Sequence, residues 1–429
     1  MQKEIYINLK NHQTRIAVVE NKKLAEIFIE RGTSGGIVGN IYKAKVKNFL
    51  AGMEAAFLDI GTGRDVFLPL TEPFVDVLIE EAFLGKIKKA FKKVFKLPRG
   101  IKKGQEILVQ VAKESMGKKG ARVTTWTSLA GRHLVFMPGV DHIGISKRII
   151  SKKERKRLRD LIKKVKVKGH GFIVRTVGEG IKEAELVREA HYLMEMWNGI
   201  LREANKVKSP ACVYEELDVA IKVIRDLFTD EDKIIVDSEE EYRKIWKFLN
   251  LWYPPIPGKG RLKLRNRVRL HNRPEPIFTV YGIESQITKA LQRKVELPSG
   301  GHIVIDEAEA LIAIDVNTGK FKGKRNLEDT VFITNNEAAQ EIARQVRLRG
   351  IGGIIIIDFI AMELKNNQDK VMKTLSEAFA DDKARITIVP LTELGLVEMT
   401  RHRIRPSLTK TLCTRCSHCG GTGLIPRKD

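Results

Sequence analysis

The chain has 429 residues, and its 77 Lys and Arg against 53 Asp and Glu give a formal net charge of +24. Its 43% of hydrophobic residues excludes a disordered chain, and its length predicts about three folded units at roughly 150 residues per domain. We expect no membrane span and no signal peptide, because no apolar run is long enough for either. Four cysteines are too few for a disulfide scaffold, so the reducing cytoplasm is the expected location. A Lys/Glu-rich thermophile surface would explain many charges, but the positive excess favours a polyanionic partner such as nucleic acid.

The first part of the chain predicts short strands and then a small β-barrel. Strands are expected over residues 4–9, 14–19 and 25–30, before a Gly-rich boundary at 35–40. Further short β segments, separated by turn signals, are expected over 41–46, 53–59, 65–68 and 106–111. That spacing favours a barrel. The basic run 86–96 has apolar residues at helical spacing, which predicts an exposed amphipathic insertion.

The rest of the chain predicts mixed segments and then an α/β pattern. Helices are expected over residues 151–165, 181–207, 283–292, 335–349 and 368–379. Strands are expected over residues 169–176, 310–316, 353–358 and 386–390. Four consecutive isoleucines at 354–357 suggest a strand that is buried on both faces.

Two of these apolar strands end in an acid. Asp315 follows one and Asp358 the other, and Asn317 points to the same side of the chain as Asp315. In open α/β sheets, ligands bind at the carboxyl ends of strands. Each Asp alone would suit a loop or helix cap. As a pair in a basic protein they favour a Mg²⁺ site, because two close carboxylates repel unless a cation lies between them.

The C-terminus carries a cysteine cluster. Cys413, Cys416 and Cys419 have C-x₂-C-x₂-C spacing, with His418 between the last two. This spacing predicts zinc, and since structural zinc takes four ligands, either His418 or a second chain completes the site. Cys212 stands alone and is expected to be a small buried core residue.

Several motifs together resemble the ribonuclease E/G family over nearly the whole chain. The resemblance is strongest over residues 283–349, 352–362 and 397–423. In order, the motifs are IESQI, LPSGG, IDVNTG, TNNEAA, EIARQVRLR, GGIIIIDFI, VEMTRHRIRPSL and CSHCGGTG.

The resemblance implies an α+β multidomain fold. It consists of an RNase H-like domain with an inserted S1 (OB-fold) barrel, a 5′-sensor region, a DNase I-like α/β catalytic domain and a zinc-link. The implied boundaries are RNase H-like parts at 1–35 and 212–275, the barrel at 36–125 with the basic insertion at 86–103, the sensor at 126–211, the catalytic domain at 276–400 and the zinc-link at 401–429.

The resemblance also implies roles for single residues. Asp315 and Asp358 match the acids that hold Mg²⁺, and Asn317 matches an assisting residue. Cys416 and Cys419 match a zinc-link in which two protomers give two thiolates each, and Cys413 could add a third. The RNA-contacting positions correspond to Phe57, Phe67 and Lys119. For either Phe, the barrel core is an equally good interpretation from the residues alone. The pocket for a 5′-monophosphate corresponds to Arg175, Thr176, Gly131, Val135 and Arg385.

The implied function is metal-dependent endonucleolytic cleavage of single-stranded, A/U-rich RNA, stimulated by a 5′-monophosphate. Products would carry 5′-phosphate and 3′-hydroxyl ends, in ribosomal RNA maturation and mRNA decay. The alternative is a non-catalytic S1-type factor that only binds ribosomal RNA. A homodimer through the zinc-link is expected. Higher oligomers stay open, because relatives continue beyond the position of Asp429 into a small domain that helps dimers associate. Ala361 departs from the acid that many relatives carry.

Overall fold

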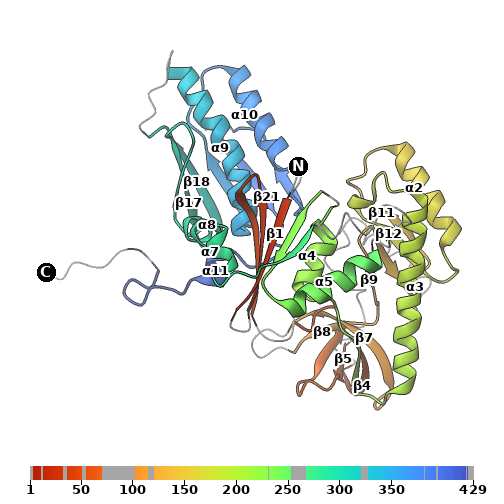
Figure 1. Cartoon of the computed structure of the whole chain (residues 1–429). Coiled ribbons are helices and arrows are strands. Elements are labelled where there is room, and N and C mark those ends of the chain that lie inside the picture. The colour runs from red at the N-terminus through yellow and green to blue at the C-terminus, as the bar shows by residue number, and fades with distance from the viewer. Residues whose placement is uncertain are drawn as a thin grey trace. The chain divides into compact units, whose positions relative to one another are not determined.

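The computed structural model describes residues 3–10, 13–31, 36–50, 55–69, 102–114, 120–229, 231–252, 267–319, 327–380, 382–392, 395–421 and 423. The chain divides into two compact units (Figure 1). The first combines residues 1–33 with 228–429, and the second is residues 34–227. None of the helices in the described ranges is long and apolar enough to cross a membrane.

A five-stranded sheet in the first unit joins the N-terminus to a distant part of the chain. Its order is β15 (Val268–Leu270), β14 (Lys233–Val236), β1 (Lys3–Lys10), β2 (Gln13–Glu20) and β3 (Lys23–Arg31). β1 runs antiparallel to β2 but parallel to β14. The whole second unit is therefore inserted between β3 and β14. The helices α5 (Glu239–Trp252), α7 (Ile277–Val280) and α8 (Ile283–Ala290) follow in the chain.

A six-stranded sheet forms the rest of the first unit. Its order is β16 (Lys294–Glu296), β17 (His302–Glu307), β18 (Leu311–Asn317), β19 (Gly353–Asp358), β21 (Leu396–Arg401) and β20 (Ile386–Ile388). β18 and β19 are parallel. The helices α9 (Leu327–Arg349) and α10 (Lys365–Ala378) pack side by side (Figure 1) and share one core with one face of this sheet. α11 (Leu408–Leu412) follows β21.

The expectation that the isoleucine strand is buried on both faces is wrong. In β19 only Ile355 and Ile357 are fully buried, whereas Ile354 is 51% exposed and Ile356 is half-buried. Side chains alternate between the two faces of a strand, and the helical core covers only one of them. The other face of the sheet is left largely open, and it is the face to which Asp358 points.

The second unit contains the expected small barrel. β4 (Ile41–Leu50), β5 (Ala55–Asp59), β6 (Val66–Pro69), β8 (Arg122–Thr124) and β7 (Glu106–Lys113) pair in that order, and β7 closes the ring on β4. β13 (Ala211–Tyr214) adds to β4, with Val213 inward and Cys212 exposed. The expected burial of Cys212 is therefore wrong, because it lies on the outer side of an added strand. The basic insertion at 86–103 lies almost wholly outside the described residues.

A four-stranded sheet and two helices complete the second unit. The sheet order is β11 (Ile143–Ile145), β12 (Gly171–Val174), β10 (Leu134–Met137) and β9 (Leu129–Ala130). Its helices α2 (Lys152–Val165) and α3 (Glu183–Lys206) pack on a core that includes Phe136 and Phe172. Ser151 caps α2, since its hydroxyl accepts the Glu154 amide. The short η2 (Thr176–Gly178) and α4 (Val219–Leu227) are the remaining helices described here.

Candidate metal and nucleic-acid sites

Asp315 and Asp358 lie directly opposite each other on neighbouring strands. They are the last paired residues of the parallel ladder between β18 and β19. Strands in a sheet are about 4.8 Å apart, so the two side chains leave the same face as close neighbours. Both are exposed, while Ile314 and Ile357, one residue earlier, are buried on the helical side. Pairing in this register brings together two carboxylates from distant parts of the chain.

Asn317 orients one of these carboxylates. Its side-chain amide donates a hydrogen bond of 2.8 Å to Asp315 Oδ2. The backbone of Asn317 lies close to Gly301, where a Cβ would come within 2.8 Å of the Asn317 carbonyl oxygen. Glycine at 301 therefore permits the close approach of the LPSGG and IDVNTG segments, and this approach fixes the end of β18 beside the carboxylates.

A buried asparagine fixes the chain beyond Asp358. Asn335, fully buried on α9, donates to the Ile360 carbonyl at 2.8 Å and accepts from the Ile360 amide at 3.1 Å. It therefore takes the place of a strand partner just past the end of β19. Asn335 belongs to the TNNEAA motif, and the motif was the only sequence signal of its role. Ala361 follows directly and is exposed.

The charge of the pair is not balanced by a basic side chain within the described ranges, where no Lys or Arg forms an ion pair with Asp315 or Asp358. Those ranges also contain no cluster of three or more His, Cys, Asp or Glu that could hold a metal ion. Mg²⁺ needs only one or two protein carboxylates, because waters and phosphate oxygens complete its octahedron. The donor set of two carboxylates and a carboxamide therefore fits Mg²⁺ better than a metal that requires an all-protein cage.

The two barrel phenylalanines form an outward-facing pair. Phe57 and Phe67 are direct partners across β5 and β6, and their rings meet edge to face with centroids 5.8 Å apart. Both are half-buried, whereas the alternate positions, among them Leu58 and Leu68, fill the barrel core. The barrel-core interpretation of Phe57 and Phe67 is therefore wrong. Lys119 lies outside the described residues.

Arg175 is held against the backbone of a neighbouring turn. Its Nη1 donates to the Gly131 carbonyl at 2.7 Å and to Asp226 Oδ1 at 2.7 Å. Thr176 is exposed, and its hydroxyl lies 2.8 Å from that of Ser146. Val135 is buried in β10, opposite Ile173 of β12. Four of the five predicted sensor residues thus lie in the second unit, and Arg385 lies in the first unit, just before β20.

Glycine at 131 is required by a buried acid. A Cβ at this position would lie 2.1 Å from Glu189 Oε1. Glu189 is itself occupied, since it accepts the His133 amide at 2.8 Å and contacts His133 Nδ1 at 2.7 Å. The turn that supplies the carbonyl for Arg175 is therefore fixed by α3, the helix that carries Glu189.

Sequence reasoning missed the acid that orients Arg175. Asp226 accepts from Arg175 and also from Arg225 Nε at 3.0 Å. Burial alone would raise the pKa of the Asp226 carboxyl, but the charges of Arg225 and Arg175 outweigh it and hold this pKa well below its usual range. Asp226 is thus a fixed negative charge behind the Arg175 guanidinium. Nothing in its local sequence marked it.

The cysteine cluster follows α11 in a Gly-rich turn. Cys413 and Cys416 are exposed, and Cys419 is half-buried. The Gly423 amide donates to Cys419 Sγ at 3.3 Å. Among the described residues, no group of three or more His, Cys, Asp or Glu gathers here, so the zinc site stays a prediction.

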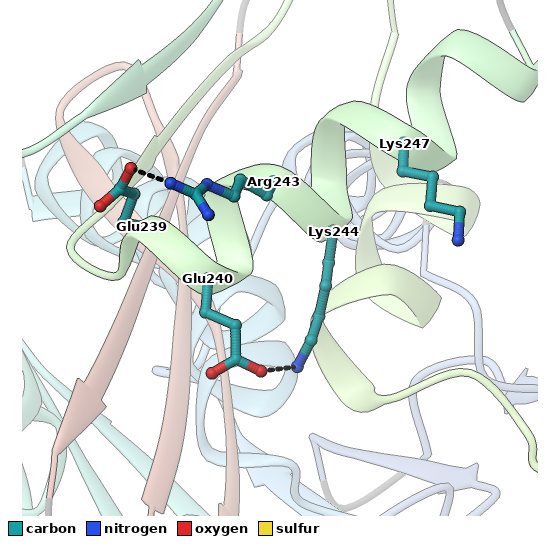
Figure 2. A pocket seen from close by; sticks show the side chains of 5 residues that line it. All are labelled: Glu239, Glu240, Arg243, Lys244 and Lys247. Carbon is teal, nitrogen blue, oxygen red and sulfur yellow. Dashed lines mark hydrogen bonds and ion pairs between the residues drawn. The ribbon is translucent and has the colours of Figure 1, made fainter.

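A cavity of about 430 Å³ lies along α5, away from every predicted site residue. Figure 2 shows its lining, in which Glu239 pairs with Arg243 at 2.6 Å and Glu240 with Lys244 at 2.9 Å. Lys247 completes the wall. These are exposed ion pairs one helical turn apart, which contribute little energy and leave no converging groups for a ligand. We assign no site to it.

Comparison with known proteins agrees with the motifs. The model of the ribonuclease E/G family matches residues 128–404. Ribonuclease G of Escherichia coli (strain K12) is 41% identical over 426 residues, which is 99% of this chain and 85% of that protein. Ribonuclease G of Haemophilus influenzae is 40% identical over 98% of this chain and 84% of its own length. Ribonuclease E of Escherichia coli is 37% identical over 99% of this chain but only 39% of its own length. The chain therefore belongs to the ribonuclease E/G family, and the prediction that it is an endoribonuclease is confirmed.

Proposed function

We propose that this protein hydrolyses single-stranded RNA at a Mg²⁺ site formed by Asp315 and Asp358. The observation that carries the proposal is their direct pairing across β18 and β19 on an open sheet face. Two exposed carboxylates at this spacing have little structural use, since they repel each other and cap no helix. An open face also gives an extended RNA strand access to both.

The residues of the chain would divide the work as follows. Asp315 and Asp358 would hold the cation, and Asn317 would keep the Asp315 carboxylate in one orientation through its 2.8 Å hydrogen bond. When bound, Mg²⁺ would polarise the scissile phosphate and lower the pKa of a water. That water would attack the phosphorus in line with the 3′-oxygen, and the bond between phosphorus and the 3′-oxygen would break. The 3′-oxygen takes up a proton, so one product ends in a 5′-phosphate and the other in a 3′-hydroxyl. No 2′-hydroxyl chemistry is needed.

The second unit would select the substrate. Phe57 and Phe67 offer two rings as a stacking platform for unpaired bases, which favours single strands. Arg175 and Thr176 would bind a 5′-monophosphate, because a guanidinium and a hydroxyl suit a terminal phosphate. Lys119 and Arg385 would each add a positive charge that attracts RNA. We infer that A/U-rich ribosomal RNA precursors and mRNA are the targets.

The decisive test replaces Asp315 by Asn. A 5′-phosphorylated, A/U-rich RNA is incubated with each protein in Mg²⁺ or EDTA, and products are separated by size. We expect the D315N variant to bind RNA almost as the unchanged protein does but to cleave at least 100-fold more slowly, an order of magnitude typical of losing a catalytic group. Asp306→Asn is the matched control, since Asp306 lies on the same sheet but pairs with Arg293. Undiminished cleavage by D315N would reject the site. Binding without any Mg²⁺-dependent product from the unchanged protein would favour the non-catalytic alternative.

We further propose that Cys416 and Cys419 bind zinc together with the same pair from a second protomer, with Cys413 close enough in sequence to join. This proposal predicts about one zinc per two chains. The Cys416→Ser variant should be a monomer in analytical ultracentrifugation, whereas Cys212→Ser, which changes the isolated exposed thiol, should remain a dimer. A zinc-free dimer that Cys416→Ser leaves intact would exclude the link.

The finer domain assignment is also a proposal. Insertion of residues 34–227 between β3 and β14 supports an RNase H-like domain interrupted by an S1-type barrel and the sensor region. The helix-covered six-stranded sheet supports a DNase I-like catalytic domain over 276–400. Few cysteines and a positive charge that suits cellular RNA support a cytoplasmic location.

A further inference from the structure

Helix α2 concentrates positive charge to an unusual degree. Residues 147–168 contain 12 Lys and Arg and two acids, so these 22 residues alone carry 12 − 2 = +10 of the net +24 of the chain. Leu158, Leu161 and Ile162 face the core and are buried, which fixes how the helix is rotated. The remaining faces carry the charges.

Part of this charge has a structural use. Arg155 is half-buried and donates to the backbone carbonyls of Ser146 and Ile149. Arg157 binds both oxygens of Glu154 and the Ile181 carbonyl. Arg155 thus ties α2 to residues 146–149 and Arg157 ties it to Ile181, so neither guanidinium is available to a ligand.

The acids in and around α2 are already paired. Glu154, Asp160, Glu183 and Asp141 pair with, respectively, Arg157, Lys163, Lys164 and Lys166. Four exposed cations of the helix form no ion pair with any described residue: Lys152, Lys153, Lys156 and Arg159. A network of surface salt bridges could explain a charged helix that binds no ligand. The four cations without an ion pair in the described ranges do not belong to such a network.

The unpaired cations form a row. Lys152, Lys156 and Arg159 are spaced by four and three residues, so they lie on one side of the helix, away from its buried side. At 1.5 Å per residue they follow one another at intervals of about 4.5–6 Å along the axis. Phosphates of a stacked strand recur about every 3.4 Å. A strand that ran along α2 could place a phosphate near each cation.

This row belongs to the same unit as the 5′-phosphate residues. α2 packs on β11, which pairs with β12, and β12 leads directly to Arg175 (Figure 1). Ser146, whose carbonyl binds Arg155, contacts the Thr176 hydroxyl through its own hydroxyl at 2.8 Å. An RNA held by its 5′ end at Arg175 and Thr176 thus has a cationic helix anchored beside it.

We propose that the row Lys152, Lys156 and Arg159 binds the phosphate backbone of the RNA next to its 5′ end. The proposal rests on the proposed function, since it concerns the same substrate. It adds a second, sequence-independent contact to the sensor, and affinity would then depend on the length of RNA as well as on its terminal phosphate. An anionic membrane is a poorer partner, because the apolar side of α2 is buried and cannot enter a bilayer.

The test is the salt dependence of binding in the full chain. The K152Q/K156Q/R159Q variant is compared with K365Q/K370Q/K373Q, which removes three exposed cations from α10. Binding of a single-stranded, 5′-monophosphorylated RNA of about 20 nucleotides is measured by anisotropy in EDTA, from 50 to 200 mM KCl. The slope of log K against log salt is negative, and the loss of three phosphate contacts should make it less steep by about 2, at about 0.7 for each contact. The α10 variant should keep the unchanged slope.

Each outcome decides a different point. Equal salt slopes for the α2 variant and the unchanged protein would overturn the inference. This holds even if the unchanged protein cleaves RNA and the D315N variant does not. Absence of RNA binding by the unchanged protein would instead refute the proposed function. Loss of sedimentation with phosphatidylglycerol vesicles in the α2 variant, with RNA binding unaltered, would assign the row to a membrane and also overturn the inference.

Discussion

Neutralising Asp226 should uncouple recognition of the 5′ end from catalysis. The carboxylate binds Arg175 at 2.7 Å and Arg225 at 3.0 Å, and the Arg225 side chain is only 4% exposed. In the D226N variant, the one charged partner left to Arg225 among the described residues is Glu216, at 3.8 Å. Loss of one member of a buried pair costs about 3–5 kcal/mol, and we expect about 3 kcal/mol because Asn still accepts a hydrogen bond.

Two measurements follow from that magnitude. For a unit of this size, about 3 kcal/mol corresponds to a fall in melting temperature of roughly 6–12 °C, which calorimetry of the full chain can detect. Arg175 would still bind the Gly131 carbonyl but lose its charged anchor. We therefore expect the preference for 5′-monophosphate over 5′-hydroxyl RNA, measured as the ratio of kcat/KM values, to fall by about tenfold, while kcat/KM for 5′-hydroxyl RNA stays constant.

The pH dependence gives an independent check. The pKa of Asp226 is depressed in the folded protein, so its contribution to stability is complete above the unfolded pKa of about 3.9. The contribution is lost as the pH falls toward the lower folded pKa. The difference in unfolding free energy between the unchanged protein and D226N should be constant above about pH 5 and shrink below about pH 4. Asp160→Asn, which breaks the exposed pair with Lys163, is the control and should change stability by less than about 1 kcal/mol. An equal loss of cleavage on both RNAs, or a stability difference that does not vary with pH, would refute this role for Asp226.

Three further predictions concern single side chains. Phe57→Ala should weaken the binding of single-stranded RNA by about 1–3 kcal/mol in a titration and barely change the melting temperature. Leu58→Ala, in the barrel core, should instead cost about 2–5 kcal/mol of stability. A larger loss of stability in Phe57→Ala than in Leu58→Ala would place Phe57 in the core. Gly131→Ala should lower the melting temperature, because the new Cβ would displace the Glu189 carboxylate. An unchanged melting temperature would show that the backbone around residue 131 can relax. Asn335→Ala should leave two backbone groups beyond β19 without partners and cost about 2–6 kcal/mol of stability in urea unfolding. It should also reduce cleavage more than RNA binding. Full activity would show that the end of β19 is fixed by other contacts.

Much of the local structure follows from short-range patterns. Short apolar segments predicted β1 to β3 and the barrel strands β4 to β7 to within a few residues, but not β8, and the predicted helix 151–165 matched α2. Helix α9 begins at Leu327, eight residues before the expected start, and in its first turns only the polar Thr330 and the apolar Val331 are buried. The strands β17 and β21 were not predicted. Both nevertheless alternate between buried and more exposed positions, the pattern of a half-covered strand.

The sequence by itself determined which groups are present: two acids after apolar strands, a pair of aromatic residues in a barrel, a run of cations and a cysteine knuckle. The family motifs identified most of them. Only the tertiary structure decided their partners. Register pairs Asp315 with Asp358, and strand alternation turns Phe57 outward. The position of α4 places Asp226 within 2.7 Å of Arg175. The physical reason is that propensity and periodicity act over a few neighbouring residues, whereas a charge or a hydrogen bond acts between whichever atoms packing brings within about 3 Å.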